Sequence, residues 1–262
     1  MPKEKNKKLK VAILSLTSCE GCQISILDLG EKFFEQLKDI DIVEMNLVEE
    51  TREAPRFDAA FVEGAPITRE NREKLIEVRK KTDFLAALGS CATTGSIMDL
   101  KNYQDKKKAI KYVYKNTAKI NNPNVMPIWR VVKVDYRLET CPVNNQEFLD
   151  VLNCLKAGRK PESRVFPVCW ECQLRGALCL LKKGQPCMGP ITRGGCGAIC
   201  AVNKKNCYGC RGPLPRINFE NFRKKILTLT SQKYFEEILK VFGVEDDMKR
   251  EGEHGHKIRT RK

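Results

Sequence analysis

The chain has little of what several common protein classes require. Only 2 of its 262 residues are histidines, and aromatic residues make up 7%. No apolar run approaches the ~18–20 residues of a membrane helix, so we expect no membrane span. The sequence has no G-x-G-x-x-G after a strand and no G-x-x-x-x-G-K-[ST], so we expect no bound dinucleotide or nucleotide. A short apolar run near the start, without a small-residue cleavage site, predicts a cytoplasmic protein.

Cysteine, in contrast, is abundant, with 13 residues. In a reducing compartment, clustered cysteines usually hold metal rather than form disulfides. Eight of them lie in the second half of the chain: Cys169, Cys172, Cys179, Cys187, Cys196, Cys200, Cys207 and Cys210. Four more, Cys19, Cys22, Cys91 and Cys141, are scattered over the preceding part of the chain, and Cys154 stands alone.

The first half of the sequence alternates between two hydrophobic patterns. Short apolar runs predict buried strands at Val11–Leu16, Ile42–Val48, Asp58–Val62, Phe84–Leu88 and Val131–Tyr136. Helical spacing predicts helices at Gln23–Leu37, Thr68–Lys80 and Asn144–Ala157. This alternation predicts an α/β fold, an open and mostly parallel sheet with helices on both faces.

The four scattered cysteines each follow a predicted strand. Cys19 and Cys22 follow the first strand, Cys91 lies in the turn LGSCATTG, and Cys141 directly precedes Pro142. Because the carboxyl ends of parallel strands line one crevice, we expect these thiols to meet there. Four thiolates at one point suit a tetrahedral Zn²⁺ or a [4Fe–4S] cluster equally well.

From about Pro161 the periodicity disappears, and Gly, Pro, Cys, Lys and Arg dominate. Such a segment buries little apolar surface, so metal must order it. We therefore expect two domains, 1–160 with an α/β fold and 161–262 with a cysteine-rich, irregular fold. Helical patterning returns at Phe219–Leu227 and Ser231–Phe242, which predicts C-terminal helices.

The spacing of the eight late cysteines is C-x2-C-x6-C-x7-C followed by C-x3-C-x6-C-x2-C, which divides into two sets of four. Two interleaved zinc sites are one interpretation, in a zinc-stabilised module that binds nucleic acid through the net charge of +15. Low aromatic content and the lack of an RNP-type motif disfavour that module, and the spacing favours iron–sulfur over zinc. Cys154 follows Val151 on the apolar side of a predicted helix, so we expect a buried structural thiol.

The combined motifs SCEGCQ, ALGSCATTG, TCP, CLLKKGQPCMGPITRGGC and CYGC resemble the small, electron-transferring subunit of nickel–iron hydrogenases over roughly residues 9–215. Within that family the sequence most resembles the cytoplasmic group, such as the delta subunit of archaeal sulfhydrogenases, with the gamma subunit of coenzyme F420-reducing hydrogenase a near relative. The resemblance implies a flavodoxin-like domain followed by an irregular iron–sulfur domain.

The resemblance also assigns three [4Fe–4S] clusters. It gives the proximal cluster Cys19, Cys22, Cys91 and Cys141, and the distal cluster Cys169, Cys172, Cys179 and Cys187. The medial cluster takes Cys196, Cys207 and Cys210, with Cys200 close to a position where better-known members often have proline and a [3Fe–4S] cluster. We therefore expect a four-iron medial cluster. Glu20 and the pair Glu63–Gly64 match weaker family features beside the proximal ligands.

The resemblance implies that H₂ chemistry takes place on a partner, the [NiFe] large subunit, while this chain passes electrons to flavin-containing or ferredoxin-like iron–sulfur subunits. A subunit related to the quinone oxidoreductases is a further alternative, disfavoured because that relative carries adjacent cysteines and one cluster. We expect no nucleic acid partner, and interpret the basic charge as compensation for clusters plus a surface for acidic partners. The lysine run from Lys101 to Lys119 is interpreted as a solvated face.

Overall fold

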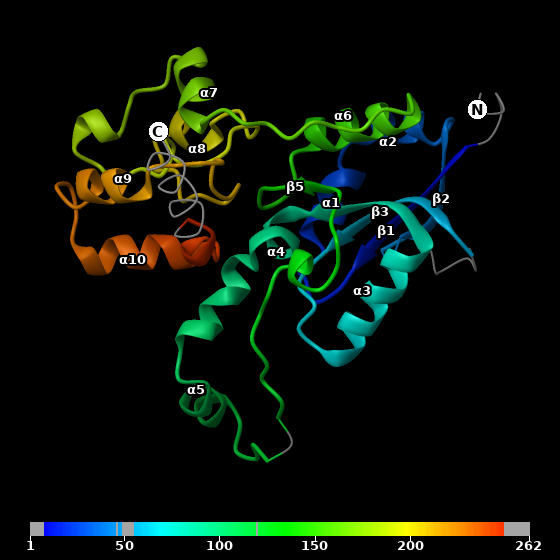
Figure 1. Ribbon diagram of the computed structural model, residues 1–262, viewed down its shortest axis with the longest axis horizontal. Helices are drawn as coiled ribbons and strands as arrows, with labels where there is room; N and C mark the ends of the chain where they lie inside the picture. The colour runs from blue at the N-terminus through cyan, green and yellow to red at the C-terminus, as the bar shows by residue number, and fades with distance from the viewer. Residues whose placement is uncertain (1–7, 46, 49–54, 119, 249–262) are drawn as a thin grey trace, which may run out of the picture. The chain divides into compact units, whose positions relative to one another are not determined.

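The computed structural model describes residues 8–45, 47–48, 55–118 and 120–248, coloured by position in Figure 1. The chain forms two compact units. The first comprises residues 1–93 and 125–163, and the second comprises residues 94–124 and 164–262. The domain boundary was expected near residue 160, and the chain passes from the first unit to the second for the last time after Ser163. Residues 94–124 precede this boundary but pack with the second unit.

A five-stranded parallel sheet forms the centre of the first unit, with the strand order β2-β1-β3-β4-β5 (Figure 1). The strands are β1 (Leu9–Ser15), β2 (Ile40–Met45), β3 (Phe57–Glu63), β4 (Thr82–Leu88) and β5 (Tyr136–Leu138). This order reverses direction between β1 and β3, as in flavodoxin-like folds, where ligands bind beyond the carboxyl ends of the strands. The predicted α/β architecture is confirmed.

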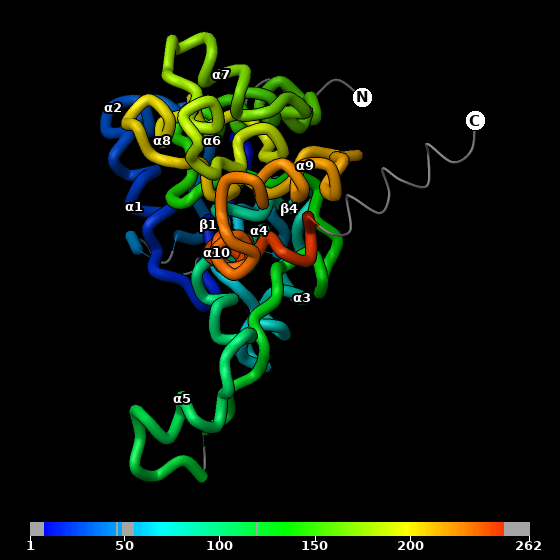
Figure 2. Tube along the Cα trace, turned by 90° about the vertical axis from the view of Figure 1, so that its left-hand side faces the viewer, coloured from blue at the N-terminus to red at the C-terminus, as the bar shows by residue number. Residues whose placement is uncertain are grey.

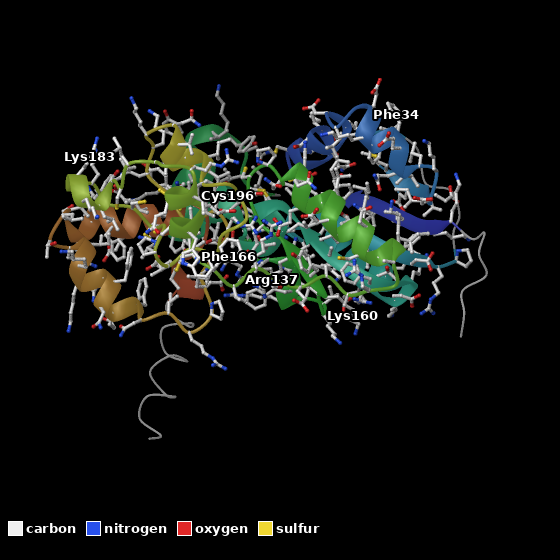
Figure 3. All side chains as sticks on the ribbon, turned by 90° about the horizontal axis from the view of Figure 1, so that it is seen from above. Phe34, Arg137, Lys160, Phe166, Lys183 and Cys196 are labelled. Carbon is white, nitrogen blue, oxygen red and sulfur yellow. The ribbon has the colours of Figure 1, made fainter. Side chains whose placement is uncertain are left out.

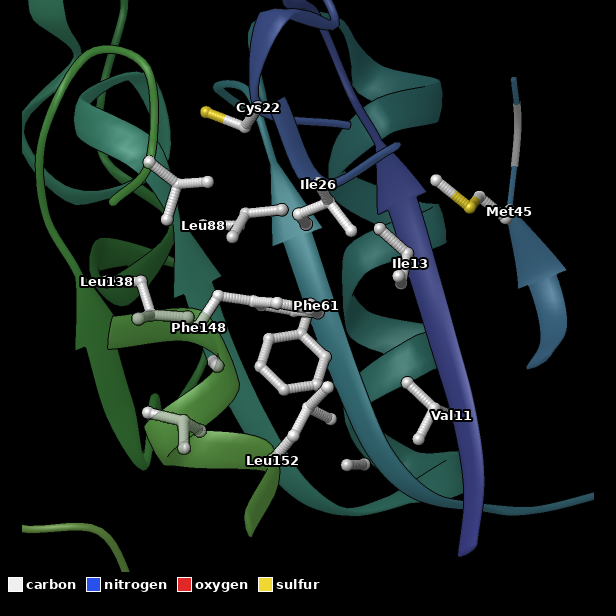
Figure 4. Close-up of a cluster of buried hydrophobic side chains, with 14 of the residues drawn as sticks. Val11, Ile13, Cys22, Ile26, Met45, Phe61, Leu88, Leu138, Phe148 and Leu152 are labelled. Atoms are coloured by element: carbon white, nitrogen blue, oxygen red, sulfur yellow. The ribbon is translucent and has the colours of Figure 1, made fainter. Parts of the chain in front are cut away.

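Helices cover both faces of the sheet. Those of the first unit are α1 (Gly21–Leu27), α2 (Glu31–Gln36), α3 (Arg69–Lys81), α4 (Gly89–Thr94) and α6 (Asn145–Lys156), with a 3₁₀ turn η2 (Ile128–Arg130). Alternate residues of each strand point to opposite faces. Phe61 packs with Ile26 of α1 and Phe148 of α6 (Figure 4), whereas Ala60 and Val62 face the side covered by α3. Because both faces are buried, the strands are apolar throughout.

Two predicted elements of the first unit were wrong in detail. The single helix expected at Gln23–Leu37 is broken into α1 and α2 at Gly30, whose φ of 55° lies in the left-handed region that glycine adopts readily. The strand expected at Val131–Tyr136 begins only at Tyr136. The reason is Asp135, whose side chain accepts a hydrogen bond from the Leu85 N–H at 2.9 Å and so replaces a backbone partner in the ladder.

The second unit is built from short helices around its own apolar core. They are η1 (Ser96–Tyr103), α5 (Lys106–Val113), α7 (Val168–Leu174), η3 (Leu181–Lys183), α8 (Ile199–Val202), α9 (Phe219–Ile226) and α10 (Gln232–Val241). The two C-terminal helices were predicted, and Ser231 caps α10 by accepting a hydrogen bond from the Tyr234 N–H. Among the helices of the described residues, none combines the length and apolarity that crossing a membrane requires.

Candidate metal centres

The four scattered cysteines lie on loops and helix starts past the carboxyl ends of the strands. Cys19 follows β1, Cys22 lies on α1, Cys91 lies on α4 after β4, and Cys141 follows β5. Figure 4 shows the Cys22 side chain beyond the arrowheads of the strands. Ser90 donates its N–H to the carbonyl oxygen of Thr140 at 2.8 Å, which joins the start of α4, where Cys91 lies, to the loop that carries Cys141.

The thiols of this group also affect one another electrostatically. Burial raises the pKa of the Cys22 thiol, and the neighbouring Glu63 and Cys91 raise it further. Burial likewise raises the pKa of Cys141, with a smaller contribution from Cys19. Glu63 raises the pKa values of both Cys22 and Cys141, so the two pairs lie in one neighbourhood of the first unit. That they hold a single cluster stays a prediction.

Two glycines leave room for the sulfur atoms of this group. A Cβ built on Gly21 would lie 3.3 Å from the Sγ of Cys19. One built on Gly89 would approach the Sγ of Cys22 closer than 3.0 Å, a separation that real Cβ atoms essentially never show. Gly89 also has a φ of 79°, in the left-handed region. Gly89 is thus favoured by its backbone conformation and by its close approach to a thiol, and Gly21 has a tight contact with a second thiol.

A buried carboxylate supports the start of α1. Glu63, at the end of β3, accepts hydrogen bonds from the N–H groups of Cys22 at 3.1 Å and Gln23 at 3.3 Å. The positive end of a helix favours a carboxylate, although burial raises the pKa of Glu63 overall. Glu20 precedes the helix with a φ of 60° and accepts a hydrogen bond from the Ser15 hydroxyl at 2.8 Å. Glu63 therefore fixes the backbone of a candidate ligand.

Four cysteines of the second unit form a clear second group: Cys169, Cys172, Cys179 and Cys187. Burial raises the pKa of the Cys169 thiol to about 11, and Cys187, Cys172 and Cys179 each raise it further. A Cβ on Gly189 would lie 3.3 Å from the Sγ of Cys169 and 3.6 Å from the Sγ of Cys187, so this glycine lies between the two sulfurs. These contacts gather the four residues predicted as one ligand set.

The remaining four cysteines are gathered less cleanly. Cys207 is buried, and burial raises the pKa of its thiol, with smaller contributions from Cys210 and Cys187; burial likewise raises the pKa of Cys196, with a small contribution from Cys200. The Sγ of Cys187 accepts a hydrogen bond from the Cys207 N–H at 3.4 Å. Cys187 therefore lies at the junction of the two predicted sets, and the division between them stays a prediction.

Packing of large side chains holds the segment around Cys196 in place. Phe166 and Trp170 stack with their ring centroids 5.7 Å apart, and Phe166 leaves no room for a side chain at position 194, where the chain has glycine. Phe166 and Cys196 are labelled in Figure 3. Glu171 of α7 accepts a hydrogen bond from the Gly195 N–H at 2.9 Å. These contacts hold the segment in place without metal.

The comparisons with known proteins agree with this geometry. The family described as "NADH ubiquinone oxidoreductase, 20 Kd subunit" matches residues 19–155. The chain is 36% identical to "Sulfhydrogenase 2 subunit delta" of Pyrococcus furiosus over 209 residues, which cover 78% of this chain and 86% of the relative. It is 32% identical to a subunit of the F420-non-reducing hydrogenase of Methanocaldococcus jannaschii, with 78% and 82% covered. The chain belongs to the family of hydrogenase small subunits.

A solved structure of an NAD⁺-reducing [NiFe]-hydrogenase in the H₂-reduced state is also similar to this hydrogenase subunit. The TM-score is 0.54 at 25% identity, covering 60% of this chain and 95% of that chain. The resemblance inferred from the cysteine motifs is confirmed. The comparisons do not support the zinc-stabilised nucleic-acid-binding module. The range 19–155 contains the first cysteine group, and the eight late cysteines of this hydrogenase subunit lie outside it.

The donor atoms of this hydrogenase subunit fit the iron–sulfur clusters that its family implies. None of the 13 cysteines is joined in a disulfide bond, and cysteine thiolates are the usual ligands of [4Fe–4S] clusters. Among the described residues, no three Cys, His, Asp or Glu side chains lie close enough to hold one metal ion. A cubane is larger than an ion and spreads its thiolates more widely. The buried amide of Gln23, directly after Cys22, has no hydrogen-bond partner in the described structure, which also fits a polar group bound nearby.

One buried charged side chain beside a candidate ligand was missed by the sequence reasoning. Arg211 is 1% exposed, the largest of the fully buried side chains, and its Nε donates a hydrogen bond to the Gly194 carbonyl oxygen at 2.7 Å. Burial raises the pKa of the Cys196 thiol, and the charge of Arg211 partly opposes this rise. A side chain on Gly195 would collide with this guanidinium at 2.6 Å. The sequence does place Arg211 directly after the last CxxC pair, but nothing in that pattern predicts its burial.

Cys154 was predicted to be a buried structural thiol. It lies on α6 and is half-buried rather than buried. It belongs to the first unit, as the four cysteines of the first group do, but none of the shifts in the thiol pKa values of that group is caused by Cys154. It is therefore a useful cysteine for comparison with the candidate ligands.

Proposed function

We propose that this hydrogenase small subunit relays electrons between the nickel–iron site of a large subunit and a flavin or iron–sulfur partner, through three [4Fe–4S] clusters. The observation that carries the proposal is the placement of twelve cysteines in a chain of this family. Four follow the carboxyl ends of strands in a parallel sheet, and eight lie in a second unit built from short helices. Iron–sulfur clusters, when bound, supply one-electron transfer at potentials set by charge, burial and hydrogen bonds to sulfur.

The assignment of ligands follows the three groups. The first cluster takes Cys19, Cys22, Cys91 and Cys141, and the second takes Cys169, Cys172, Cys179 and Cys187. The third takes Cys196, Cys200, Cys207 and Cys210. Of these, the third set is the least directly supported, because Cys187 also contacts Cys207.

The chain's own residues prepare these sites in two ways. Glu63 and Gly89 fix Cys22, the first by hydrogen bonds to the start of α1 and the second by leaving space beside its sulfur. Arg211 places a buried positive charge beside Cys196, which offsets the negative charge of thiolates in a region of low dielectric constant. Burial and charge compensation are the means by which a protein tunes such centres.

The subunit is non-catalytic in this proposal, and H₂ is split or formed on the large subunit. Further flavin-containing and ferredoxin-like iron–sulfur subunits accept the electrons in a cytoplasmic complex. Thirteen cysteines with no disulfide bond among them support a reducing compartment. The relatives differ in their named acceptors, so the acceptor follows from the companion subunits.

Metal analysis of the anaerobically purified complex tests the proposal. We expect about twelve iron atoms from this chain, from three cubanes of four, together with nickel from the large subunit. A chain that contains zinc and no iron would refute it.

Single cysteine variants sharpen the test. Cys200→Ser should lose up to about four iron atoms, or convert the medial cluster to a three-iron form with a [3Fe–4S] EPR signal. Cys154→Ser is the matched control and should keep the full iron content. A [3Fe–4S] signal in carefully purified unmodified protein would contradict the assignment of Cys200, as would unchanged iron in Cys200→Ser.

A further inference from the structure

Residues 101–118 and 120–124 of the second unit form a projecting hairpin that we call the lysine arm. Helix α5 lies at its far end in Figures 1 and 2, and none of the eight residues of α5 is buried. Only Lys106, Ala109 and Ile110 of α5 are even half-buried, so packing within its own chain stabilises this helix little. Packing within the chain therefore does not explain the exposed apolar and charged side chains of the lysine arm.

Internal hydrogen bonds give the lysine arm a defined shape. Asp105 caps α5 by accepting hydrogen bonds from the N–H groups of Lys107 and Lys108 at 3.1 and 3.2 Å. The Nζ of Lys101 donates to the side-chain oxygen of Asn122 at 2.8 Å, and the Nζ of Lys106 donates to the Asn122 carbonyl oxygen at 3.2 Å. These two lysines tie the outgoing segment to the returning one, so their charges serve the hairpin itself.

Four other lysines, Lys107, Lys108, Lys111 and Lys115, are exposed at the end of the lysine arm. Asp105 is the one acidic residue between Lys101 and Lys119, and it is engaged in the helix cap. The surface of the arm is therefore strongly positive over the length of α5.

Large apolar side chains lie among these lysines. Tyr112 is 94% exposed, Val113 is 67% exposed and Tyr114 is 55% exposed. Contiguous exposed apolar residues rimmed by charge are typical of protein interaction sites, where an apolar centre is surrounded by a polar rim. The lysine run alone was interpreted as a solvated face, but three exposed apolar side chains are not typical of a purely solvated face.

We propose that the lysine arm docks on an acidic surface of a partner subunit, with Tyr112, Val113 and Tyr114 at the centre and the four lysines at the rim. Only the existence of a partner subunit rests on the proposed function. The chemistry of the arm favours a protein over nucleic acid. Residues 101–124 contain no arginine, the side chain best suited to bind phosphate through two hydrogen bonds, and the aliphatic Val113 has no counterpart on a phosphate backbone.

Carbodiimide cross-linking of the anaerobically purified complex tests this proposal. The reagent joins lysine amines to carboxylates that are in contact, without a spacer. We expect mass spectrometry to find Lys107, Lys108, Lys111 or Lys115 joined to Asp or Glu of another subunit. The same lysines should become accessible to an amine-acylating reagent when high salt dissociates the complex.

Charge reversal provides the matched comparison. The triple variant Lys107→Glu, Lys108→Glu, Lys111→Glu should weaken retention of the partner about tenfold or more, because like charges then face each other. The control reverses three other exposed lysines of the same unit, in the triple variant Lys224→Glu, Lys225→Glu, Lys233→Glu, and should retain the partner. Iron content should be unchanged in both variants, so a failure of docking is distinguishable from a failure of cluster binding.

Three results would overturn the proposal. One is full acylation of the four lysines within the intact complex. Another is equal partner retention by the arm variant and the unmodified chain. The third is protection of the arm that nuclease treatment abolishes, which would assign it to nucleic acid.

Discussion

Replacing Gly89 by alanine tests whether the space beside Cys22 is a requirement of the site. Gly89 has a φ of 79°, and a Cβ there would approach the Sγ of Cys22 closer than 3.0 Å. Gly158, in the same unit, has a φ of 68°, but a Cβ there would meet nothing within 4 Å. The two alanine variants therefore share the backbone strain and differ in the collision with the thiol.

The magnitudes follow from these two terms. A non-glycine residue in the left-handed region costs about 1–2 kcal/mol, which applies to both Gly158→Ala and Gly89→Ala. Forcing an extra methyl group into a packed site costs about 1–3 kcal/mol more, which applies to Gly89→Ala alone. A change of 1 kcal/mol shifts the unfolding midpoint of a chain of 150–250 residues by about 2–4 °C. Gly89→Ala should thus unfold at least a few degrees below Gly158→Ala.

Thermal unfolding and iron analysis, both under anaerobic conditions, measure the outcome. Because the added methyl group displaces a candidate ligand, Gly89→Ala should also lose about four iron atoms, while Gly158→Ala keeps all of them. If both variants unfold together and retain equal iron, the close approach of Gly89 to Cys22 has no role in the site, and the reasoning fails.

Two further predictions concern buried or half-buried charges. Arg211→Met should lower the reduction potential of the medial cluster, because a positive charge beside Cys196 favours the more negative, reduced state. An EPR-monitored redox titration measures the shift. A tenfold change in the reduction equilibrium corresponds to about 59 mV for one electron. The control is Arg193→Gln, which removes a half-buried arginine that donates a hydrogen bond to the Pro213 carbonyl oxygen. An equal shift of the reduction potential in both variants would argue against a specific role for Arg211. Asp135→Asn should destabilise the first unit by about 1 kcal/mol near neutral pH. Burial opposes the charge of Asp135, but the Leu85 N–H and Arg79 together outweigh burial and hold the pKa of Asp135 below its usual range. The stabilisation by the Asp135 charge is present above the usual pKa of aspartate and is lost as the pH falls through the lowered pKa. The unfolding curves of Asp135→Asn and the unmodified chain should therefore converge in acid. A difference in stability that persists in acid would exclude the charge as its source.

The sequence predicted the sheet and the meeting of the first cysteine group for a simple physical reason. Buried parallel strands are continuous apolar runs, and their carboxyl ends share one edge of the sheet. Where a single side chain replaced a backbone partner, as Asp135 does at Leu85, the pattern misplaced the start of a strand by several residues. Such a replacement leaves no trace in hydrophobic periodicity.

The cysteine-rich segment was less predictable. Its spacing indicates ligand sets, and the contacts of Cys169 agree with one of them. The burial of Arg211 and the junction position of Cys187 depend on the path of the backbone between the cysteines. That path is set by packing such as Phe166 against Gly194, which a spacing pattern does not encode.

The division of the second unit between two stretches of chain has a consequence for the order of its assembly. Helix α10 packs on η1, and Gly243, just after α10, leaves no room for a side chain against the carbonyl oxygen of Thr94. During synthesis, residues 94–124 leave the ribosome long before α10 is made, whereas the first unit is complete once Ser163 has emerged. Domains generally fold as units as they emerge. The unit with eight cysteines therefore closes only after α10 has emerged, and any cluster bound there would enter a chain whose sheet has already formed.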